Sequence, residues 1–372
     1  MANQGVRDTT FLAMLTGWDA TELQNFQLQD GTSYAAVAGQ LNAALVSLNA
    51  EFSNDWMAQL YSVTDQPDLE YRVGSSNGFV VHTEYGRADA ARAATEGHML
   101  PLIPYERMLG WTWDLLRKAR MPQIEADIAD AIKDARDKRR IAILTRLLKN
   151  GDDSGTANGL GSSGYSPGFA TTAGSTSVDF LPPSYGGTSF ATTHEHYNAH
   201  ADGAWTNAIV SDLKSELREH GHEPPYMLLI SPSDETVVRA LSDFVPVAQS
   251  LVRYGSTQDL ATLGIGEIGL GAYPIGAMDD FGVYVVRGMP QYYGFATKSY
   301  GRLSQRNPVA IRLQKGISQW SVVAMPDPNA GNGMYPLQHA MLFMEFGVGV
   351  KDRTNGSPCY VYSGTWADGT AT

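Results

Sequence analysis

The chain has 372 residues, of which 43% are hydrophobic and 18% charged, enough for one large domain or two ordinary ones. Its formal net charge of -12 argues against a dedicated nucleic-acid binder, whose affinity comes largely from Lys and Arg on phosphates. Cys359 is the only cysteine, which excludes an intramolecular disulfide and a cysteine-based metal cluster. The N-terminus has no apolar signal core and no run is long enough to span a membrane. We therefore expect a protein of a reducing cytoplasm with no membrane partner.

Residues 1–62 are interpreted as an extended arm that carries one helix. Ser33 is a candidate cap, and the helix should run through Glu51. Its apolar positions share one face, namely Val37, Leu41, Leu45 and Leu48. This stripe needs a partner surface that buries it.

Residues 63–118 are predicted to form a long two-stranded ribbon. Its parts are strands at Leu69–Val73 and Phe79–Tyr85, a polar tip at Gly86–Gly97 and a return through His98–Leu116. Pro101 and Pro104 place the return strand at a sheet edge, because proline donates no ladder hydrogen bond. An isolated ribbon is marginal in water, so we expect it to lie on another subunit.

The clearest helix signal is the stretch from Pro122 to Lys149, and Gly151 is its predicted stop. Its acidic residues lead and its basic residues follow, which complements the helix dipole. The apolar residues recur with a 3.6-residue period, at Ile124, Ile128, Ile132, Ala135, Ile141, Leu144, Leu147 and Leu148. We expect this rod to brace something larger than one compact core.

The segment 152–203 is rich in Gly, Ser and Thr, so we predict a loop with a short hairpin and no core. Thr206 should then cap a helix that ends at Gly221. A buried strand is predicted at Met227–Ile230, and a capping box in Ser231–Asp234 should open a helix that ends near Leu241.

From Gly255 onward the sequence predicts mostly strands. The candidates are Val283–Arg287, Tyr293–Lys298, Val309–Leu313 and Trp320–Ala324. The end is predicted to be a hairpin in which Met341–Val350 and Cys359–Tyr362 pair through Asn355-Gly356, because Asn-Gly is the strongest short hairpin signal. Cys359 should be a small buried residue of its second strand.

The order of these pieces, together with three stretches of sequence, resembles the major capsid protein of tailed bacteriophages, the Hong Kong 97 type. The stretches are EYGRADAARAATEGHMLPLIPYERMLGWTWDLLRKARMPQIEADIADAIKDARDKRR (84–140), SFATTHEHYNAHADGAWTNAIVSDLKSELREHG (189–221) and MLFMEFGVGVKDRTNGSPCYVYSG (341–364). The first is similar to that family's extended loop running into its spine helix.

The resemblance implies an α+β fold with an N-arm, an extended two-stranded loop, a long spine helix, and peripheral and axial domains. The implied segments are the N-arm at 1–62, the extended loop at 63–118, the spine helix and peripheral domain at 119–244, a mostly axial part at 245–338 and a return to the peripheral domain at 339–372. The peripheral part contains the Gly/Ser/Thr-rich insertion at 152–203.

The implied function is self-assembly, as pentamers and hexamers, into an icosahedral shell around double-stranded DNA that is contacted non-specifically. The protein would reside in the virion, and in the host cytoplasm during assembly. The resemblance also implies other partners, namely a portal, decoration proteins and a separate scaffolding protein. The family's type member cross-links subunits through a Lys of the extended loop, but residues 63–117 contain no Lys, so we expect no such link.

Candidate subunit-interface residues gather at the ribbon tip, on the return strand and in the long helix. They are Tyr85, Arg87, Asp89, Arg92, Glu96, Trp111, Trp113, Arg139 and Arg140. A solvated loop is the alternative for the tip residues. The two tryptophans share a strand face and should anchor packing.

The candidate metal ligands are His194, His196 and His200. His196 and His200 stand four apart, which would place both on one helix face, but H-E-x-x-H is absent and the surroundings resemble a loop. We therefore expect ordinary hydrogen bonds, and no metal, cofactor or catalytic role.

Two other motifs are rejected. A G-x-G-x-x-G pattern at Gly264–Gly269 has no helix after it, so it does not predict a dinucleotide site. The Asp279-Asp280 pair should face water.

Two alternatives stay open at this stage. One is an encapsulin-type nanocompartment shell, which nucleic acid content would distinguish from a phage capsid. The other is a metal-dependent hydrolase built on His194, His196 and His200, which stoichiometric zinc would support.

Overall fold

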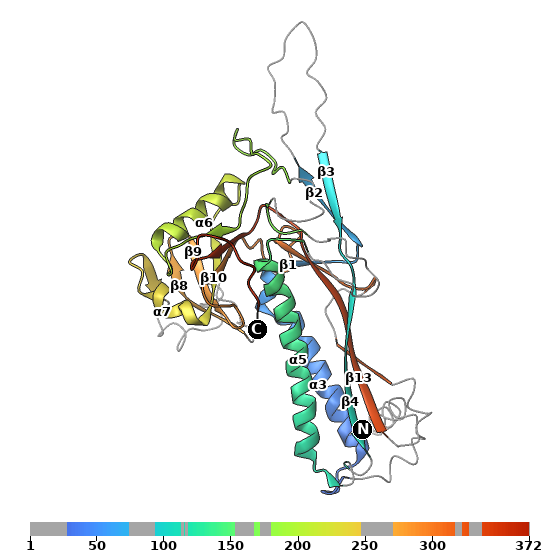
Figure 1. The fold of residues 1–372 in the computed structure, drawn as a ribbon. Coiled ribbons are helices and arrows are strands. Elements are labelled where there is room, and N and C mark those ends of the chain that lie inside the picture. The colour runs from blue at the N-terminus through green and yellow to red at the C-terminus, as the bar shows by residue number, and fades with distance from the viewer. Residues whose placement is uncertain are drawn as a thin grey trace. The chain divides into compact units, whose positions relative to one another are not determined.

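The computed structural model describes residues 28–73, 94–112, 115, 118–152, 167–171, 180–246, 271–316, 322–326 and 337–371. The fold combines helices and sheets, as predicted (Figure 1). The chain divides into two compact units. The first comprises Met1–Asn54, Ile103–Arg139 and Gln319–Phe346, and the second comprises Asp55–Leu102, Arg140–Ser318 and Gly347–Thr372. The five segments predicted from the resemblance stay a prediction.

The first unit contains α3 (Tyr34–Asn54) and most of α5 (Met121–Leu148), which confirms both predicted helices. Ser33 caps α3, since its Oγ accepts a hydrogen bond from Ala36 N–H at 3.3 Å. The predicted face of α3 is buried, and Phe52 extends it. In α5 the buried residues of this unit are Met121, Ile124, Ile128, Ala131, Ala135 and Arg139, whereas Ile132 is only half-buried.

Polar contacts join α5 to other parts of the first unit. Arg136 Nε donates to Glu51 Oε2 of α3 at 3.0 Å. At the start of the helix, Met121 N–H donates to Asp30 Oδ2 at 2.8 Å, which satisfies a donor with no partner inside the helix. Among the described helices, none combines the length and the apolar composition needed to cross a membrane.

The sheet of the first unit consists of β4 (Ile103–Thr112), β12 (Val323–Pro326) and the first part of β13 (Leu337–Val350). β4 runs antiparallel to β13 from Ile103 opposite Phe346 to Thr112 opposite Leu337. The prediction that this strand is the return strand of the ribbon is therefore wrong. Its predicted edge position is confirmed, because β4 pairs only with β13 among the described strands. A ten-residue ladder satisfies more backbone groups than a loose ribbon could.

The ribbon itself lies in the second unit. β2 (Asp68–Val73) pairs antiparallel with β3 (Ala94–Met99), from Asp68 opposite Met99 to Val73 opposite Ala94. Ala94–Gly97, predicted to belong to the tip, is therefore strand. The predicted strand Phe79–Tyr85 and the rest of the tip lie outside the described residues.

A seven-stranded sheet forms the centre of the second unit, in the order β5-β14-β10-β6-β9-β8-β7. Its strands are β5 (Asn198–Ala199), β6 (Tyr226–Ile230), β7 (Phe244–Pro246), β8 (Ala272–Met278), β9 (Phe281–Val286), β10 (Tyr293–Thr297) and β14 (Ser357–Tyr360). β6 is buried at every residue and pairs parallel with β9 and antiparallel with β10. The prediction of a buried strand here is confirmed.

Helix α6 (Asn207–Glu219) packs on this sheet with the predicted face buried, including Ile209, Leu213 and Leu217. Thr206 caps it as predicted, with Oγ1 accepting from Ile209 N–H at 3.3 Å. The same core takes in Cys359, which is a buried small residue as expected, and burial raises the pKa of its thiol.

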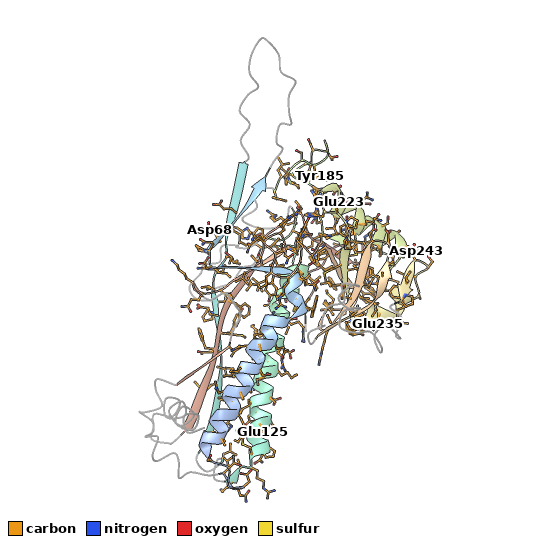
Figure 2. The ribbon with its side chains drawn as sticks, turned by 180° about the vertical axis from the view of Figure 1, so that it is seen from behind. Asp68, Glu125, Tyr185, Glu223, Glu235 and Asp243 are labelled. Atoms are coloured by element: carbon orange, nitrogen blue, oxygen red, sulfur yellow. The ribbon has the colours of Figure 1, made fainter. Side chains whose placement is uncertain are left out.

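The Ser231 turn opens a 3-10 helix at Pro232–Asp234 and then α7 (Glu235–Arg239). Ser231 Oγ accepts from Ser233 N–H at 3.3 Å. Asp234 does not complete a capping box, because its Oδ2 accepts from Tyr292 N–H at 2.8 Å instead. Figure 2 labels Glu235, whose Oε2 accepts from Tyr273 of β8 at 2.5 Å.

Another sheet region of the second unit follows a 3-10 helix at Trp56–Gln59. β1 (Tyr61–Thr64) pairs parallel with β11 (Val309–Arg312), which pairs antiparallel with Gly347–Val350 of β13. Leu69, Leu100 and Ala310 form a small buried cluster beside it.

The predicted terminal hairpin is wrong. β13 pairs with β4, β11 and β12, whereas β14 pairs with β10 and β5. Asn355 and Gly356 form a buried corner between them: the Asn355 side chain is fully buried, and a Cβ on Gly356 would lie 2.3 Å from the Phe169 ring. The pair therefore links strands of two different sheets instead of forming a hairpin turn.

Candidate functional site: a histidine cluster at the end of α6

The segment from His194 to His200 is extended rather than helical. His196 N–H donates to Ala170 O and His200 N–H donates to Tyr360 O, both at 2.8 Å. Because alternate residues of an extended chain point to the same side, His194 and His196 project together. The loop-like conformation expected for this segment is therefore confirmed, and it does not place His196 and His200 on one helix face.

The second part of the cluster comes from the last turn of α6. Glu219 is the final residue of the helix and His220 follows as its C-cap. The chain then leaves the helix through Gly221, whose φ of +82° favours glycine. A Cβ at Gly221 would also lie 2.5 Å from the ring of Tyr185, labelled in Figure 2. The predicted helix stop is thus confirmed, and it directs His220 toward the loop.

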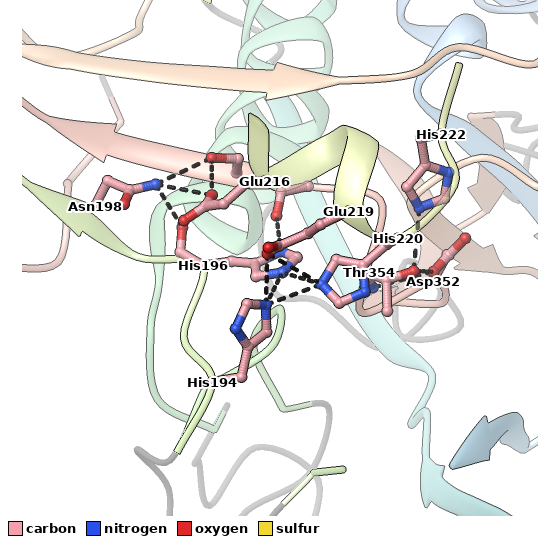
Figure 3. A network of polar contacts seen from close by, with 11 residues as sticks. His194, His196, Asn198, Glu216, Glu219, His220, His222, Asp352 and Thr354 are labelled. Atoms are coloured by element: carbon pink, nitrogen blue, oxygen red, sulfur yellow. Dashed lines mark hydrogen bonds and ion pairs between the residues drawn. The ribbon is translucent and has the colours of Figure 1, made fainter. Parts of the chain in front are cut away.

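Three imidazole nitrogens meet at this point (Figure 3). The Nε2 atoms of His194 and His196 are 3.1 Å apart, and each is 2.9 Å from Nε2 of His220. Glu219 Oε1 lies 3.0 Å from His194 Nε2 and 3.7 Å from His220 Nε2. All these atoms lie within 4.8 Å of one another. We call these four residues the histidine cluster.

The cluster is enclosed, most of all at His196, which is fully buried. Burial lowers the pKa of His196 to about 3 and that of His220 to about 2, and it also lowers the pKa of His194. Burial raises the pKa of Glu219. The three rings are therefore neutral near pH 7, which leaves lone pairs available for a ligand.

A contact on the far side of His196 fixes its tautomer. Nδ1 lies 2.8 Å from the carbonyl oxygen of Gly356, so Nδ1 carries the proton and donates it there. Nε2 therefore presents a lone pair to the other two rings. The buried Asn355-Gly356 corner thus positions a ring of the cluster. The ring of Phe190 packs against His220 with a centroid distance of 4.3 Å.

A second polar group adjoins the cluster, also drawn in Figure 3. Glu216 of α6 accepts hydrogen bonds from Ser357 Oγ and from Asn198 Nδ2, the latter at 2.9 Å. Although the residue is partly exposed, its carboxyl group is enclosed, and desolvation raises its pKa to about 8. Nearby, His222 contacts Tyr300 Oη at 2.8 Å and Thr354 Oγ1 at 3.1 Å, and burial lowers its pKa.

The loop around this site is better packed than predicted. Phe169, Ala170, Thr171, Phe180, His196 and Tyr197 are all buried. Tyr197 Oη donates to Lys149 O at 2.7 Å and accepts from Phe169 N–H at 3.1 Å. The prediction that residues 152–203 make no core is therefore wrong. Tyr185 and Thr188 form the one isolated bridge among the described residues, which fits the predicted short hairpin.

Of the predicted metal candidates, the structure brings together His194 and His196 but not His200. Glu195 points elsewhere, with Oε1 accepting from Asn150 Nδ2 at 3.0 Å. Sequence reasoning missed Glu219 and His220, because a position more than twenty residues away gives no spacing signal. The Gly221 stop was the available clue, since it marks where the helix end turns back.

Most predicted interface residues lie outside the described residues, namely Tyr85, Arg87, Asp89, Arg92 and Trp113. Glu96 lies in β3 opposite Tyr71. Trp111 is buried in the first unit, where Nε1 donates to Asp127 Oδ2 at 2.8 Å. Arg139 is only 2% exposed and lies over the Phe52 ring at 4.6 Å, while Arg140 is half-buried. Trp111 and Arg139 thus have contacts within the chain, and an interface role for this set stays a prediction.

The two rejected motifs have different outcomes. Gly264–Gly269 lies outside the described residues. Asp279 and Asp280 do not simply face water, because Lys214 Nζ of α6 lies 2.7 Å and 2.5 Å from their carboxylates.

Comparison with solved structures identifies the fold. A structure from Mycobacterium phage Patience matches with a TM-score of 0.63 at 18% identity, covering 91% of this chain and 91% of that chain. The capsid of an empty GTA particle matches with a TM-score of 0.46 at 15% identity, covering 82% and 89%. An encapsulin complex from Synechococcus elongatus matches with a TM-score of 0.41 at 12% identity, covering 83% and 88%. No family model and no curated protein matches the sequence. The first match shows that the chain has the Hong Kong 97-type fold.

Proposed function

We propose that this chain, with its Hong Kong 97-type fold, is the major capsid protein of a tailed bacteriophage. It assembles as pentamers and hexamers into an icosahedral shell that encloses double-stranded DNA. The observation that carries the proposal is the likeness to the Mycobacterium phage Patience structure over 91% of both chains. Heterologous contacts that close into rings of two sizes are a physical route to such a shell.

The ribbon supports assembly. β2 and β3 form a two-stranded sheet that pairs with no other described strand. Two strands alone are marginally stable in water, and Met99 at the end of β3 is 46% exposed. A neighbouring subunit that covers the ribbon would bury Met99 and stabilise the two strands.

The edge of the seven-stranded sheet supports assembly as well. β7 is the last strand of the order, and its Val245 is 65% exposed. Tyr273 of the adjacent β8 is 46% exposed. β7 pairs with no strand other than β8 among the described residues. An apolar sheet edge favours pairing with another chain, so this edge suits a contact between neighbouring capsid subunits.

The net charge of the chain suits a shell that encloses DNA without binding it tightly. With a formal net charge of -12, the chain offers packaged DNA a surface to slide along rather than to bind. Contacts with DNA are therefore non-specific. A portal, decoration proteins and a separate scaffolding protein complete the assembly. The protein acts in the virion after assembly in the host cytoplasm.

Negative-stain electron microscopy of the purified protein, combined with sedimentation, tests this function. We expect closed shells, or free rings of five and six subunits. Extraction of double-stranded DNA from nuclease-treated particles produced in infected cells supports the phage capsid, whereas a protein cargo without DNA supports an encapsulin-type shell. A well-behaved monomer or dimer at high concentration contradicts any shell.

A pair of variants at the sheet edge sharpens the test. Val245→Asp places a charge on the exposed apolar edge and should prevent shell closure while the subunit still folds. Val245→Ile keeps the apolar surface and should assemble like the unmodified chain. Equal assembly of both variants would exclude this edge from the subunit contacts.

A further inference from the structure

We propose that the histidine cluster is a Zn²⁺ site, in which His194, His196, His220 and Glu219 bind one ion and tie the loop 180–200 to the end of α6. The site lies wholly within the second unit, and the proposal does not depend on shell assembly.

The spacing of the nitrogens fits the ion. Zinc binds His nitrogens at about 2.0–2.1 Å, which in a tetrahedral site places two nitrogens about 3.3 Å apart. The three Nε2–Nε2 distances here are 2.9, 2.9 and 3.1 Å, a few tenths shorter. A point at zinc distance from all three nitrogens lies about 1.1 Å off their plane. Glu219 Oε1, at 3.0 Å from His194 Nε2, is placed to supply the fourth ligand.

Hydrogen bonds alone do not account for this arrangement. A neutral imidazole offers at Nε2 either one proton or one lone pair. Nε2 of His196 holds a lone pair, because Nδ1 donates to Gly356 O. If His194 and His220 both carry a proton at Nε2, the two protons oppose each other across 2.9 Å. If either lacks one, its lone pair opposes that of His196. A central cation accepts all three lone pairs and removes this conflict.

The surroundings fit a bound metal. The carbonyl of Gly356 orients His196 in the way that outer-shell acceptors orient metal-binding histidines. Imidazole nitrogens suit zinc, whereas Mg²⁺ and Ca²⁺ prefer sets of oxygen ligands.

Four protein ligands indicate a structural site. A catalytic zinc site keeps one position open for water, whereas a tetrahedron filled by three histidines and a carboxylate leaves none. The ligands come from two segments, the extended stretch at 194–196 and the end of α6. The ion therefore acts as a cross-link that holds the loop in place, and the same geometry disfavours the hydrolase alternative.

Metal analysis of the full chain, purified without a histidine tag, tests the proposal. We expect about one zinc per subunit by inductively coupled plasma mass spectrometry, as one closed site implies. X-ray absorption at the zinc edge should show nitrogen and oxygen neighbours at about 2.0 Å. Chelator-stripped protein should take the ion up again in a calorimetric titration with ZnCl₂. A metal-free chain that also takes up no Zn²⁺ overturns the proposal.

Matched variants assign the metal to these residues. His196→Gln and His220→Gln should lose the zinc, whereas His200→Gln, in the same segment but outside the cluster, should retain it. Glu219 is 36% exposed, so Glu219→Gln keeps the measurement possible if a buried variant fails to fold. Its Zn²⁺ affinity should fall by at least the roughly 10- to 100-fold that loss of an outer-shell partner costs. Equal zinc content in all four variants overturns the assignment.

Discussion

The Asn355 side chain binds both backbone polar groups of Lys298, accepting from its N–H and donating to its carbonyl, each at 2.9 Å. Asn355 Nδ2 also donates to Arg306 O at 3.3 Å. The side chain is fully buried, so these contacts replace those that water would make. They join the end of β10 to the corner that precedes β14.

Replacing Asn355 with Ala should destabilise the chain by about 1–3 kcal/mol, because it leaves the part-buried N–H and carbonyl of Lys298 without this partner. The midpoint of denaturant unfolding measures the loss. Gln66→Ala, at an exposed amide, serves as the control and should change stability by less than about 0.5 kcal/mol. Equal midpoints for the two variants would show that the corner contributes little.

The helices could be predicted because their signals are local. Ser33 and Thr206 cap the helices that follow them, and Gly221 ends α6, each as the sequence predicted. The period of apolar residues in α5 gave its bounds to within one residue. Caps and periodicity act over one or two turns, so they can be read from the local sequence. The Ser231–Asp234 box is the exception, because Asp234 accepts from Tyr292 N–H instead.

Strand partners and the cluster could not be predicted, because they depend on residues far apart in the chain. β4 pairs with β13, which lies more than two hundred residues away. The Asn355-Gly356 signal predicts a hairpin, but here the pair is buried against Phe169 and Lys298 and links strands of two sheets. His220 joins His194 through the same kind of long-range contact.

Gly347 permits a close approach of backbone segments in the second unit. A Cβ there would lie 2.0 Å from the carbonyl oxygen of Pro101, which is backbone and cannot rotate away. Gly347→Ala should therefore lower the melting temperature, whereas Gly151→Ala, with nothing within 4 Å of its Cβ, should not. Differential scanning calorimetry compares them. If both variants melt like the unmodified chain, the Pro101 segment moves aside without cost.

Glu216 should make stability depend on pH. Desolvation raises its folded pKa to about 8 from the ordinary value of 4.5, so the folded state holds a proton that the unfolded state releases. Stability should therefore fall as pH rises from about 4.5 to about 8, by at most about 1.4 kcal/mol per pH unit from this group. Glu216→Gln removes the titration and should flatten that part of the profile. Urea unfolding at several pH values measures it, and parallel profiles for both proteins would contradict the assignment.

The ion pair between Glu51 and Arg136 should hold α3 against α5. The two side chains are 26% and 37% exposed, so the pair contributes about 1 kcal/mol at most. Glu51→Arg should destabilise by a similar amount through repulsion, and adding Arg136→Glu should recover part of the loss. Lys133→Ala removes an exposed ion pair on the same helix and serves as the control for the change in stability. A double variant no more stable than Glu51→Arg would show that the charges do not interact.

If the chain assembles as proposed, its particles should contain no covalent link made by a lysine of residues 63–117. Residues 63–117 contain no Lys, so this segment offers no amine for an isopeptide bond with a neighbouring Asn. We therefore expect a single monomer band on a denaturing gel of boiled particles, with no ladder. Cohesion of the proposed shell would then come from non-covalent contacts, for which the ribbon and the β7 edge are the candidates. A ladder of oligomers would require a cross-link from another lysine, and mass spectrometry of its tryptic peptides would locate that residue.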